Sequence, residues 1–164
     1  MYGETVRGGV MFAVVQGKKY EAIVQDDKGD PKEAALVAQR LAEDKRLFCI
    51  IGHVNSSCTL AALPIYKEAG LTVLNTSSSA ENITQLGYTN FFTTVIHDGL
   101  QGPFLVRHAA VNLGRKRLAA MVANSDYGLG LLKSARAAGR RSITSKSWPQ
   151  RTMCRWWTRI SARS

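Results

Sequence analysis

The sequence predicts an α/β fold, a three-layer parallel sheet with helices on both faces. Short apolar runs, among them Phe48–Ile51 and Leu71–Leu74, have the length and composition of buried strands. Longer segments with apolar residues at helical spacing lie between these runs, and polar loops separate the two kinds of segment. Strands that alternate with helices of about 10–15 residues are typical of βαβ units, which form parallel sheets with right-handed crossovers.

The first part of the chain is predicted to contain two helices and one strand. Residues 2–15 carry valines and a methionine at helical spacing, which predicts a helix. Lys19–Gln25 contains Tyr, Ile and Val and is predicted to be a short strand. Asp30 is placed to cap a second helix that has Pro31 at its first position and small apolar residues on one face.

The centre of the chain, Phe48–Gly70, is predicted to be a strand, a loop and a helix. The strand Phe48–Ile51 is expected to be buried on both faces and to end at Gly52. The helix is expected to kink or break early at Pro64, because proline removes one helical hydrogen bond. Its apolar positions are Leu60, Leu63, Ile65 and Tyr66.

Further elements follow the same alternation towards the C-terminus. The predicted strands are Leu71–Leu74, Tyr88–Val95 and Arg117–Ala123, and the predicted helices are Glu81–Leu86, Gly99–Leu113 and Leu131–Ala138. No internal repeat is found.

The charge of the protein is concentrated at its C-terminal end. All 12 acidic residues and 13 of the 22 Lys and Arg lie in residues 1–126, whereas residues 127–164 hold 9 basic residues and no acid. The globular part is therefore nearly neutral, and no nucleic-acid partner is expected. No apolar run approaches the roughly 20 residues of a membrane span, and no signal peptide is predicted after Met1.

Three loops at the predicted carboxyl ends of the strands are rich in small hydroxyl residues. They are Asn55–Ser57, Thr76–Ser79 and Ser125–Tyr127. In open parallel sheets ligands bind at this edge, and the first N–H groups of a helix favour an anion. One such loop is an ordinary helix cap, formed here by Asn55 or Ser56, but three on one edge predict a small polar ligand such as a carboxylate. Because no acid and base are paired there, we expect binding without catalysis, cofactor or metal.

Seven segments, in this order and spacing, resemble a known family. They are YGETVRGGV, DDKGDPKEA, IIGHVNSSCTLAALPIYKEAG, the Thr-Ser-Ser-Ser loop, GYTNFFTT, QGP and NSDYGLG. Together they look like the N-terminal lobe of solute-binding proteins that serve ABC importers of branched-chain and related amino acids. These proteins have the type I periplasmic-binding-protein fold. The similarity covers about residues 2–138.

The resemblance implies two lobes that close on an amino acid and a partner permease in the membrane. In the family the first lobe holds the α-carboxylate through two loops, and the matching positions here are Ser56 in the first loop and Ser77 and Ser79 in the second. Tyr127 matches an aromatic residue that packs near the ligand. The resemblance also implies a periplasmic or extracytoplasmic location.

The sequence departs from the family pattern in four ways. The usual first strand before YGE and an acidic stretch after Val15 are not found. Some members have a disulfide whose positions fall here on Gly29 and Asn55. The second lobe is not found either, so we expect millimolar or weaker affinity for leucine, about −4 kcal/mol. Exposed surfaces are expected to favour self-association.

Residues 139–164 do not resemble the family or a folded element. They contain no acidic residue and no sustained apolar period. The residues 1–138 are therefore expected to form the incomplete lobe, followed by a basic, non-native or disordered tail. Our hypothesis is a shifted reading frame after Ala138, and the alternative is a genuine tail that binds phosphates or an anionic membrane.

Several further motifs are explained more simply by ordinary structural roles. His53 and Cys58 could form a pair of general base and nucleophile. The simpler expectation is that His53 is a loop histidine with no carboxylate nearby and that Cys58 is a buried core residue. The three cysteines, Cys49, Cys58 and Cys154, do not have the spacing of a metal-binding motif. The aspartates in Asp26–Asp30 do not have the spacing of an EF-hand calcium loop. The sequence Gly128-Leu129-Gly130 is expected to be a tight turn.

Two other functions remain as alternatives. The first is a ligand-sensing domain of a receptor or regulator with the same fold. The second is a small hydrolase that uses Cys58 or Ser56, which predicts a reactive nucleophile.

Overall fold

The computed structural model describes residues 2–17, 20–139 and 143–148. The chain forms two compact units. Unit 1 consists of Met1–Ser78 and Asn82–Val95, and unit 2 consists of Ser79–Glu81 and Ile96–Ser164. Within the described residues no helix has both the length and the apolar character that a membrane crossing requires.

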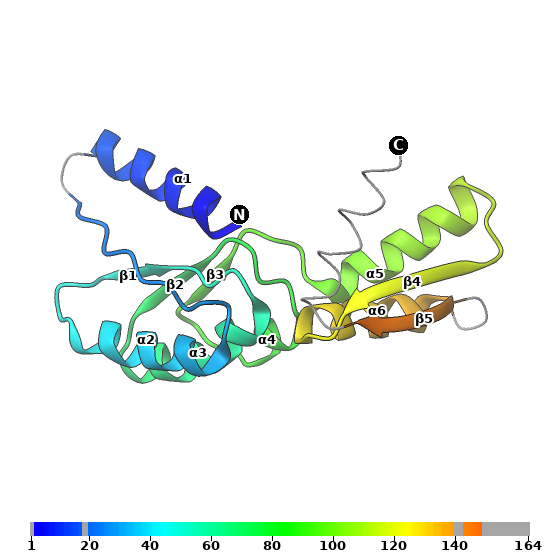
Figure 1. Cartoon of the computed structure of the whole chain (residues 1–164). Coiled ribbons are helices and arrows are strands. Elements are labelled where there is room, and N and C mark those ends of the chain that lie inside the picture. Colours follow the sequence, from blue (N-terminus) through cyan, green and yellow to red (C-terminus); the bar gives the residue numbers. More distant parts are fainter. Residues whose placement is uncertain (1, 18–19, 140–142, 149–164) are drawn as a thin grey trace. The chain divides into compact units, whose positions relative to one another are not determined.

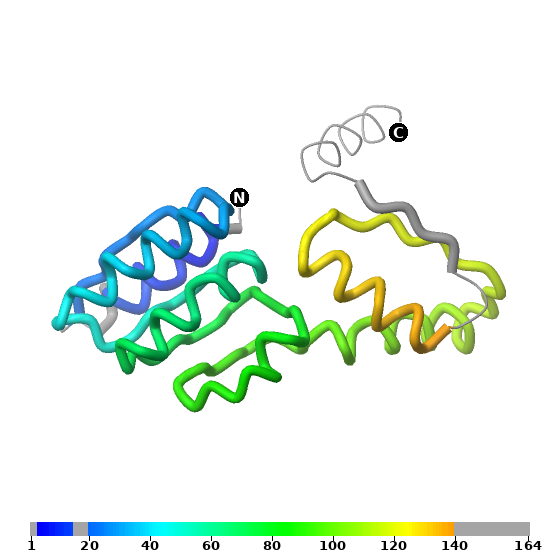
Figure 2. The backbone as a smooth tube through the Cα atoms, turned by 90° about the horizontal axis from the view of Figure 1, so that it is seen from below, coloured from blue at the N-terminus to red at the C-terminus, as the bar shows by residue number. Residues whose placement is uncertain are grey.

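Unit 1 is built on a three-stranded parallel sheet with the strand order β1-β2-β3. The strands are β1 (Cys49–Ile51), β2 (Thr72–Asn75) and β3 (Phe91–Thr93). Two helices, α2 (Pro31–Glu43) and α3 (Ser56–Glu68), lie side by side on one face of this sheet (Figures 1 and 2). Strand, helix and parallel strand follow one another here, which confirms the predicted βαβ arrangement.

The core of unit 1 lies between these two helices and the sheet. Its buried apolar side chains are Ala34, Val37 and Ala38 of α2, Cys58, Ala62, Leu63 and Tyr66 of α3, and Ile50 and Val73 of the sheet. Burial of these side chains supplies most of the stabilisation of this unit, at about 25 cal/mol per Å² of apolar surface.

The opposite face of the sheet is apolar but incompletely covered. The parallel register places Ile51 beside Leu74 and Leu74 beside Phe92. These three side chains are 42%, 38% and 55% exposed. The expected burial of Phe48–Ile51 on both faces is therefore wrong, because only Ile50 in that run is buried.

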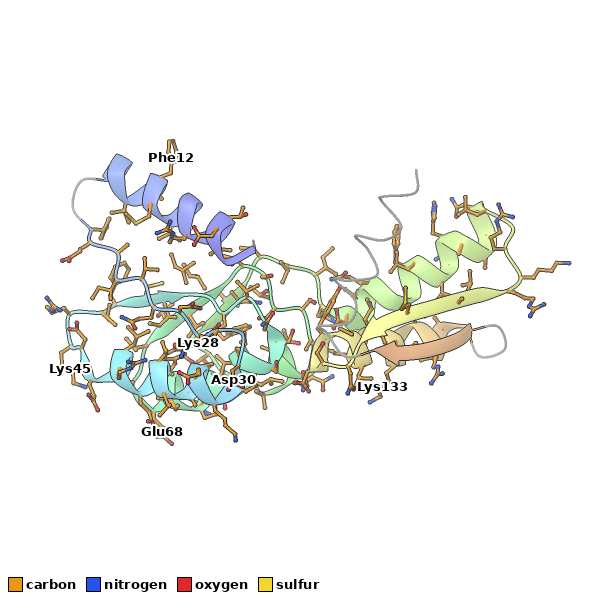
Figure 3. The ribbon with its side chains drawn as sticks, in the orientation of Figure 1. Phe12, Lys28, Asp30, Lys45, Glu68 and Lys133 are labelled. Atoms are coloured by element: carbon orange, nitrogen blue, oxygen red, sulfur yellow. The ribbon has the colours of Figure 1, made fainter. Side chains whose placement is uncertain are left out.

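Helix α1 (Tyr2–Gly17) confirms the helix predicted at the start of the chain. None of its described side chains is buried, and Phe12 points outward from the helix (Figure 3). The strand predicted for Lys19–Gln25 is wrong for its described part, residues 20–25, which form no strand. Ile23 and Val24 are exposed there, and a strand-like composition alone does not form a strand unless its N–H and C=O groups find a partner.

Unit 2 contains the second parallel pair, β4 (Leu118–Ala123) with β5 (Ile143–Trp148). Helices α5 (Asp98–Arg107) and α6 (Asp126–Ala138) pack against each other, and a π-helical segment, His108–Asn112, continues α5. A short helix, α4 (Glu81–Gln85), begins in unit 2 and continues in unit 1. The predicted helix Gly99–Leu113 is thus confirmed, with a change of helix type near its end.

Gly102 allows the close approach of α5 to α6. A Cβ atom at this position would lie 2.6 Å from the backbone nitrogen of Ala135 and would also overlap Ser134 Oγ. The Ser134 hydroxyl donates a hydrogen bond of 2.7 Å to the carbonyl oxygen of Asp98, which ties the start of α5 to α6.

Three other element boundaries differ from the predictions. Helix α3 continues through Pro64 to Glu68, so the expected early break is wrong. Leu63 and Tyr66 on either side of Pro64 are buried, and their packing outweighs the loss of one backbone hydrogen bond. Helix α6 begins five residues before the predicted Leu131, because Ser125 Oγ accepts a hydrogen bond of 3.3 Å from the Gly128 N–H. Strand β3 is shorter than Tyr88–Val95.

Residues 1–138 do not form one compact body. The chain passes from one unit to the other after Ser78, after Glu81 and after Val95, and the described strands form two sheets instead of one. Residues 143–148, which follow Ala138 in the sequence, form β5 and pair in parallel with β4. Residues 149–164, where most of the predicted tail lies, are outside the described residues.

Candidate functional site

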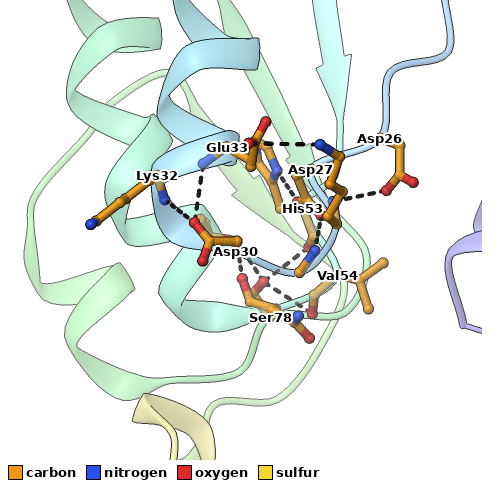
Figure 4. A network of polar contacts seen from close by, with 12 residues as sticks. Asp26, Asp27, Asp30, Lys32, Glu33, His53, Val54 and Ser78 are labelled. Atoms are coloured by element: carbon orange, nitrogen blue, oxygen red, sulfur yellow. Dashed lines mark hydrogen bonds and ion pairs between the residues drawn. The ribbon is translucent and has the colours of Figure 1, made fainter.

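The loops that follow β1 and β2 meet in unit 1, as the sequence predicted for loops at one edge of a parallel sheet. The Ser78 hydroxyl donates a hydrogen bond of 2.9 Å to the carbonyl oxygen of His53, and its oxygen lies 2.6 Å from Thr59 Oγ1 (Figure 4). Ser78 belongs to the loop after β2, His53 to the loop after β1, and Thr59 to the first turn of α3. One buried serine therefore joins both loops to the helix.

Asn75 organises the loop after β2 and is buried at the end of that strand. Its Oδ1 atom accepts hydrogen bonds from the N–H groups of Ser77 (3.2 Å) and Ser78 (2.8 Å). Its Nδ2 group donates to the Ser78 carbonyl oxygen (2.6 Å) and to Thr93 Oγ1 at the end of β3 (2.8 Å). An Asx turn of this kind fixes the backbone before any ligand arrives.

The N-terminus of α3 differs from the simple capped helix that was the ordinary alternative. Asn55 is the N-cap residue, but its side chain forms no capping hydrogen bond. Asp30 at α2 does form such bonds, to the N–H groups of Lys32 and Glu33. The helix dipole and the first N–H groups of α3 lie next to the loop organised by Asn75, which is an environment that favours a carboxylate.

The four predicted ligand-binding residues are divided between the units. Ser56 and Ser77 lie in unit 1, whereas Ser79 and Tyr127 lie in unit 2. Ser56 is 4% exposed at the first position of α3, and Ser77 is half-buried. Ser79 is 6% exposed and donates its hydroxyl hydrogen to Asp98 Oδ1 at 2.9 Å. Tyr127 is 44% exposed in the first turn of α6.

Asp27, His53 and the buried Tyr66 form a hydrogen-bonded arrangement in unit 1. Nδ1 of His53 is 2.7 Å from Asp27 Oδ2, and Nε2 is 3.1 Å from the Tyr66 hydroxyl. The expectation that no carboxylate lies near His53 is therefore wrong. Asp27 is 26 residues away in the sequence, so only the tertiary structure could reveal the pair. The hydrogen bond from His53 lowers the pKa of Asp27, which keeps this carboxylate ionised.

The same arrangement argues against a cysteine nucleophile. Both ring nitrogens of His53 are engaged, by Asp27 and Tyr66. Burial and the nearby negative charge of Asp27 raise the pKa of the Cys58 thiol to about 12. A thiol with such a pKa is almost entirely protonated near neutral pH and is a poor nucleophile.

The aspartates between residues 26 and 30 act separately. Asp26 Oδ1 accepts a hydrogen bond from the Lys28 N–H, Asp27 Oδ1 accepts one from the Gly29 N–H, and Asp30 caps α2 (Figure 4). Across the part of the chain that the structure describes, no group of three or more His, Cys, Asp or Glu side chains could hold a metal ion. The hydrogen bonds accepted by Asp26, Asp27 and Asp30 hold the turn and cap α2.

The two positions of the family disulfide are adjacent in space. A Cβ atom on Gly29 would lie 2.8 Å from Asn55 Nδ2. We expect the double variant Gly29→Cys/Asn55→Cys to form a disulfide and to raise the free energy of unfolding by about 2.5 kcal/mol. The loop-closure gain of about 3.5 kcal/mol is reduced by about 1 kcal/mol, because Gly29 has φ +67°. Thermal unfolding with and without a reductant measures the effect; equal melting temperatures, or equal gains in the single variants, would contradict it.

Asp98 is a buried carboxyl group in unit 2. It is fully buried, and Oδ1 accepts the hydrogen bond from Ser79. Its Oδ2 has no hydrogen-bond partner among the described residues and faces α6, where a Cβ on Gly130 would lie 3.4 Å away. Desolvation raises the pKa of Asp98, and the bond from Ser79 offsets part of this effect.

The raised pKa predicts how the stability of unit 2 depends on pH. Since the folded-state pKa of Asp98 is above the unfolded value, its contribution to stability is complete below the unfolded pKa and is lost as pH rises through the folded pKa. The variant Asp98→Asn should remove this slope, which is at most about 1.4 kcal/mol per pH unit. Urea unfolding at several pH values between 4 and 8 measures it, with the exposed Asp126→Asn as control. An unchanged slope in Asp98→Asn would contradict the prediction.

Comparison with known proteins adds independent information. A family model described as periplasmic binding protein matches residues 4–142. The leucine-, isoleucine-, valine-, threonine- and alanine-binding protein of Pseudomonas aeruginosa is 33% identical over 138 residues, which cover 79% of this chain and 37% of the relative. The Leu/Ile/Val-binding protein of Escherichia coli K12 is 30% identical over 120 residues, which cover 73% of this chain and 32% of the relative. The chain thus spans about a third of the length of these curated relatives.

Solved structures show the same relationship. The branched-chain amino acid substrate-binding protein LivJ of Streptococcus pneumoniae, in complex with isoleucine, aligns with a TM-score of 0.72 and 25% identity. That alignment covers 79% of this chain and 38% of LivJ. The leucine-binding protein LivK of Thermotoga maritima aligns with a TM-score of 0.83 over 90% of this chain and 45% of LivK, and at 24% identity it supports the fold alone. The match of the family model over most of the sequence shows that this chain belongs to the periplasmic binding protein family.

Proposed function

We propose that this protein is the solute-binding component of an ABC importer and binds a branched-chain or related amino acid through its α-carboxylate. The relatives from Pseudomonas aeruginosa and Escherichia coli are named as binding proteins for leucine, isoleucine and valine. One structural observation carries the proposal: Ser78 joins the loop organised by Asn75 to the loop before α3 and to the first turn of this helix.

The chemistry of these loops suits a carboxylate. Neutral N–H and hydroxyl donors together with a helix dipole stabilise a negative charge without a counter-ion. We assign the carboxylate contacts in unit 1 to Ser56, at the start of α3, and to Ser77 in the loop after β2. Ser79 and Tyr127 in unit 2 are further proposed ligand contacts, which rest on the family resemblance. For Ser79 the contact would come from the backbone, because the hydroxyl hydrogen is already donated to Asp98.

Calorimetric titration with leucine and with leucinol tests this function. Leucinol has the same side chain and amine as leucine but lacks the carboxylate. We expect weak, millimolar binding of leucine, about −4 kcal/mol, and no detectable binding of leucinol. Equal binding of the two compounds, or no binding of any branched-chain amino acid, would contradict the proposal.

The proposed activity is recognition without chemistry. The protonated Cys58 thiol and the engaged ring of His53 give no support to a hydrolase. The curated relatives are named as amino-acid-binding proteins, and LivJ as the substrate-binding protein of a branched-chain amino acid transporter. These comparisons do not favour a sensing domain of a receptor or regulator. The partner in this proposal is an ABC permease, and the place of action is the periplasm or an equivalent extracytoplasmic space.

Self-association is a further part of the proposal. The row formed by Ile51, Leu74 and Phe92 exposes apolar surface on one face of the unit 1 sheet. Parallel sheets are ordinarily covered on both faces, so an exposed row favours contact with another apolar surface. Sedimentation velocity at several protein concentrations should show association, and Phe92→Ser should reduce it.

A further inference from the structure

We propose that Asp27, His53 and Tyr66 form a hydrogen-bonded relay that positions the two carboxylate-binding loops of unit 1. The inference rests on the proposed function for its meaning, but the geometry of the relay is independent of any ligand. The three residues come from three separate segments: the turn before α2, the loop after β1, and the second half of α3. Neither Asp27 nor Tyr66 is among the predicted ligand contacts.

The direction of the hydrogen bond between Asp27 and His53 follows from the charge of Asp27. Asp27 is ionised and can only accept, so the proton lies on Nδ1 of His53 and is donated to Oδ2 at 2.7 Å. Burial and the charge of Asp27 raise the pKa of Tyr66, so its hydroxyl keeps its proton, and its oxygen lies within hydrogen-bond distance of Nε2 at 3.1 Å. The orientation of the His53 ring is thus fixed from both sides, by Asp27 and by Tyr66.

The main chain of His53 carries this fixed orientation to the loops. Its carbonyl oxygen accepts the hydrogen bond from the Ser78 hydroxyl, whose backbone N–H is held by Asn75. The Ser78 oxygen also lies 2.6 Å from Thr59 Oγ1 in the first turn of α3. A shift of His53 would therefore move the loop before α3 and release the loop after β2 at the same time (Figure 4).

The three side chains of the relay are largely shielded from solvent. Tyr66 is 1% exposed, and the side chains of His53 and Asp27 are 9% and 21% exposed. The rings of His53 and Tyr66 are stacked with centroids 5.9 Å apart. In such an environment the loss of one hydrogen-bond partner leaves another polar atom unpaired, and this weakens the neighbouring hydrogen bonds of the relay as well.

Amide hydrogen exchange tests the positioning role directly. In Asp27→Ala we expect the amide protons of residues 53–59 and 75–78 to exchange about tenfold faster or more, the factor for loss of a hydrogen bond to a charged group. Asp26→Ala is the matched control, because Asp26 is the neighbouring residue and accepts only the Lys28 N–H in the hydrogen bonds described here. Exchange in this control should stay within about twofold of the parent protein.

Two further readouts separate positioning from a general loss of structure. In the parent protein the Nδ1 proton of His53 should give a slowly exchanging NMR signal at low field, which Asp27→Ala abolishes. His53→Asn keeps a hydrogen-bond donor close to the position of Nδ1. The amide protons of residues 53–59 and 75–78 should therefore exchange nearly as slowly in this variant as in the parent protein, whereas in His53→Ala they should exchange faster. The proposal would be overturned if these amide protons exchanged as fast in Asp26→Ala as in Asp27→Ala. It would also be overturned if their exchange in Asp27→Ala were the same as in the parent protein.

Leucine titration of the same variants connects the relay to binding. Asp27→Ala should weaken leucine binding at least threefold, and Asp26→Ala should leave it unchanged. If the parent protein binds no branched-chain amino acid while Asp27→Ala still exchanges faster, the proposed function fails and the positioning of the loops stands. If leucine binds equally well to the parent protein and to Asp27→Ala, the proposed role of the relay is contradicted, whereas the proposed function stands.

Discussion

Replacing Asn75 by alanine should both destabilise unit 1 and abolish ligand binding. The side chain makes four hydrogen bonds, with the N–H groups of Ser77 and Ser78, the Ser78 carbonyl oxygen and Thr93 Oγ1. At about 1 kcal/mol for each bond, with a further cost for buried groups left unpaired, we expect a loss of about 3–5 kcal/mol. Urea unfolding measures this loss, and leucine titration measures binding.

Asn75→Asp is the matched control for this variant. An aspartate keeps the two accepting contacts with Ser77 and Ser78 and loses the two donating contacts. Its effect on stability should therefore lie between those of the parent protein and Asn75→Ala. If Asn75→Ala retains full stability and leucine binding, the loop after β2 is not held by this side chain.

Gly102→Ala should destabilise unit 2 by about 2–4 kcal/mol. The added methyl group would overlap Ser134 Oγ and lie 2.6 Å from the backbone nitrogen of Ala135. The hydroxyl could rotate away, but the backbone of α6 cannot move without separating the two helices, and overpacking of this kind is costly. Thermal unfolding followed by circular dichroism should show a clear decrease in melting temperature.

Gly8→Ala is the control for a glycine in a helix. A Cβ at Gly8 in α1 would meet no atom within 4 Å. Alanine has a higher helix propensity than glycine, by about 1 kcal/mol, so this variant should be neutral or slightly more stable. If Gly102→Ala behaves like Gly8→Ala, α5 and α6 are not closely packed at this point.

The order of the elements could be predicted from the sequence because it depends on local patterns. The helix spacing of α1, the Asp30-Pro31 cap of α2 and the apolar runs of β1, β2 and β4 each involve residues close together in the chain. The alternation of predicted strands with predicted helices then indicated the α/β class. The resemblance in YGE, GHVNSS and NSDYG identified the family, which the family model confirms.

The secondary-structure and domain predictions were wrong where contacts between segments far apart in the sequence decide the local structure. Residues 20–25 have a strand-like composition but form no strand, and α3 crosses Pro64 because buried neighbours hold it together. The division of the chain into two units depends on which contacts form between helices and sheets, so no local pattern marks it.

Sequence by itself determined the class of the fold, the family and the loops in which hydroxyl residues gather, since these depend on residues near one another. Only the tertiary structure decided that Ser79 donates its hydroxyl to Asp98, that Ser78 joins two loops, and that Asp27 fixes His53. Those contacts link residues 19, 25 and 26 positions apart. Their geometry is set by the packing of whole elements, which no single stretch of sequence contains.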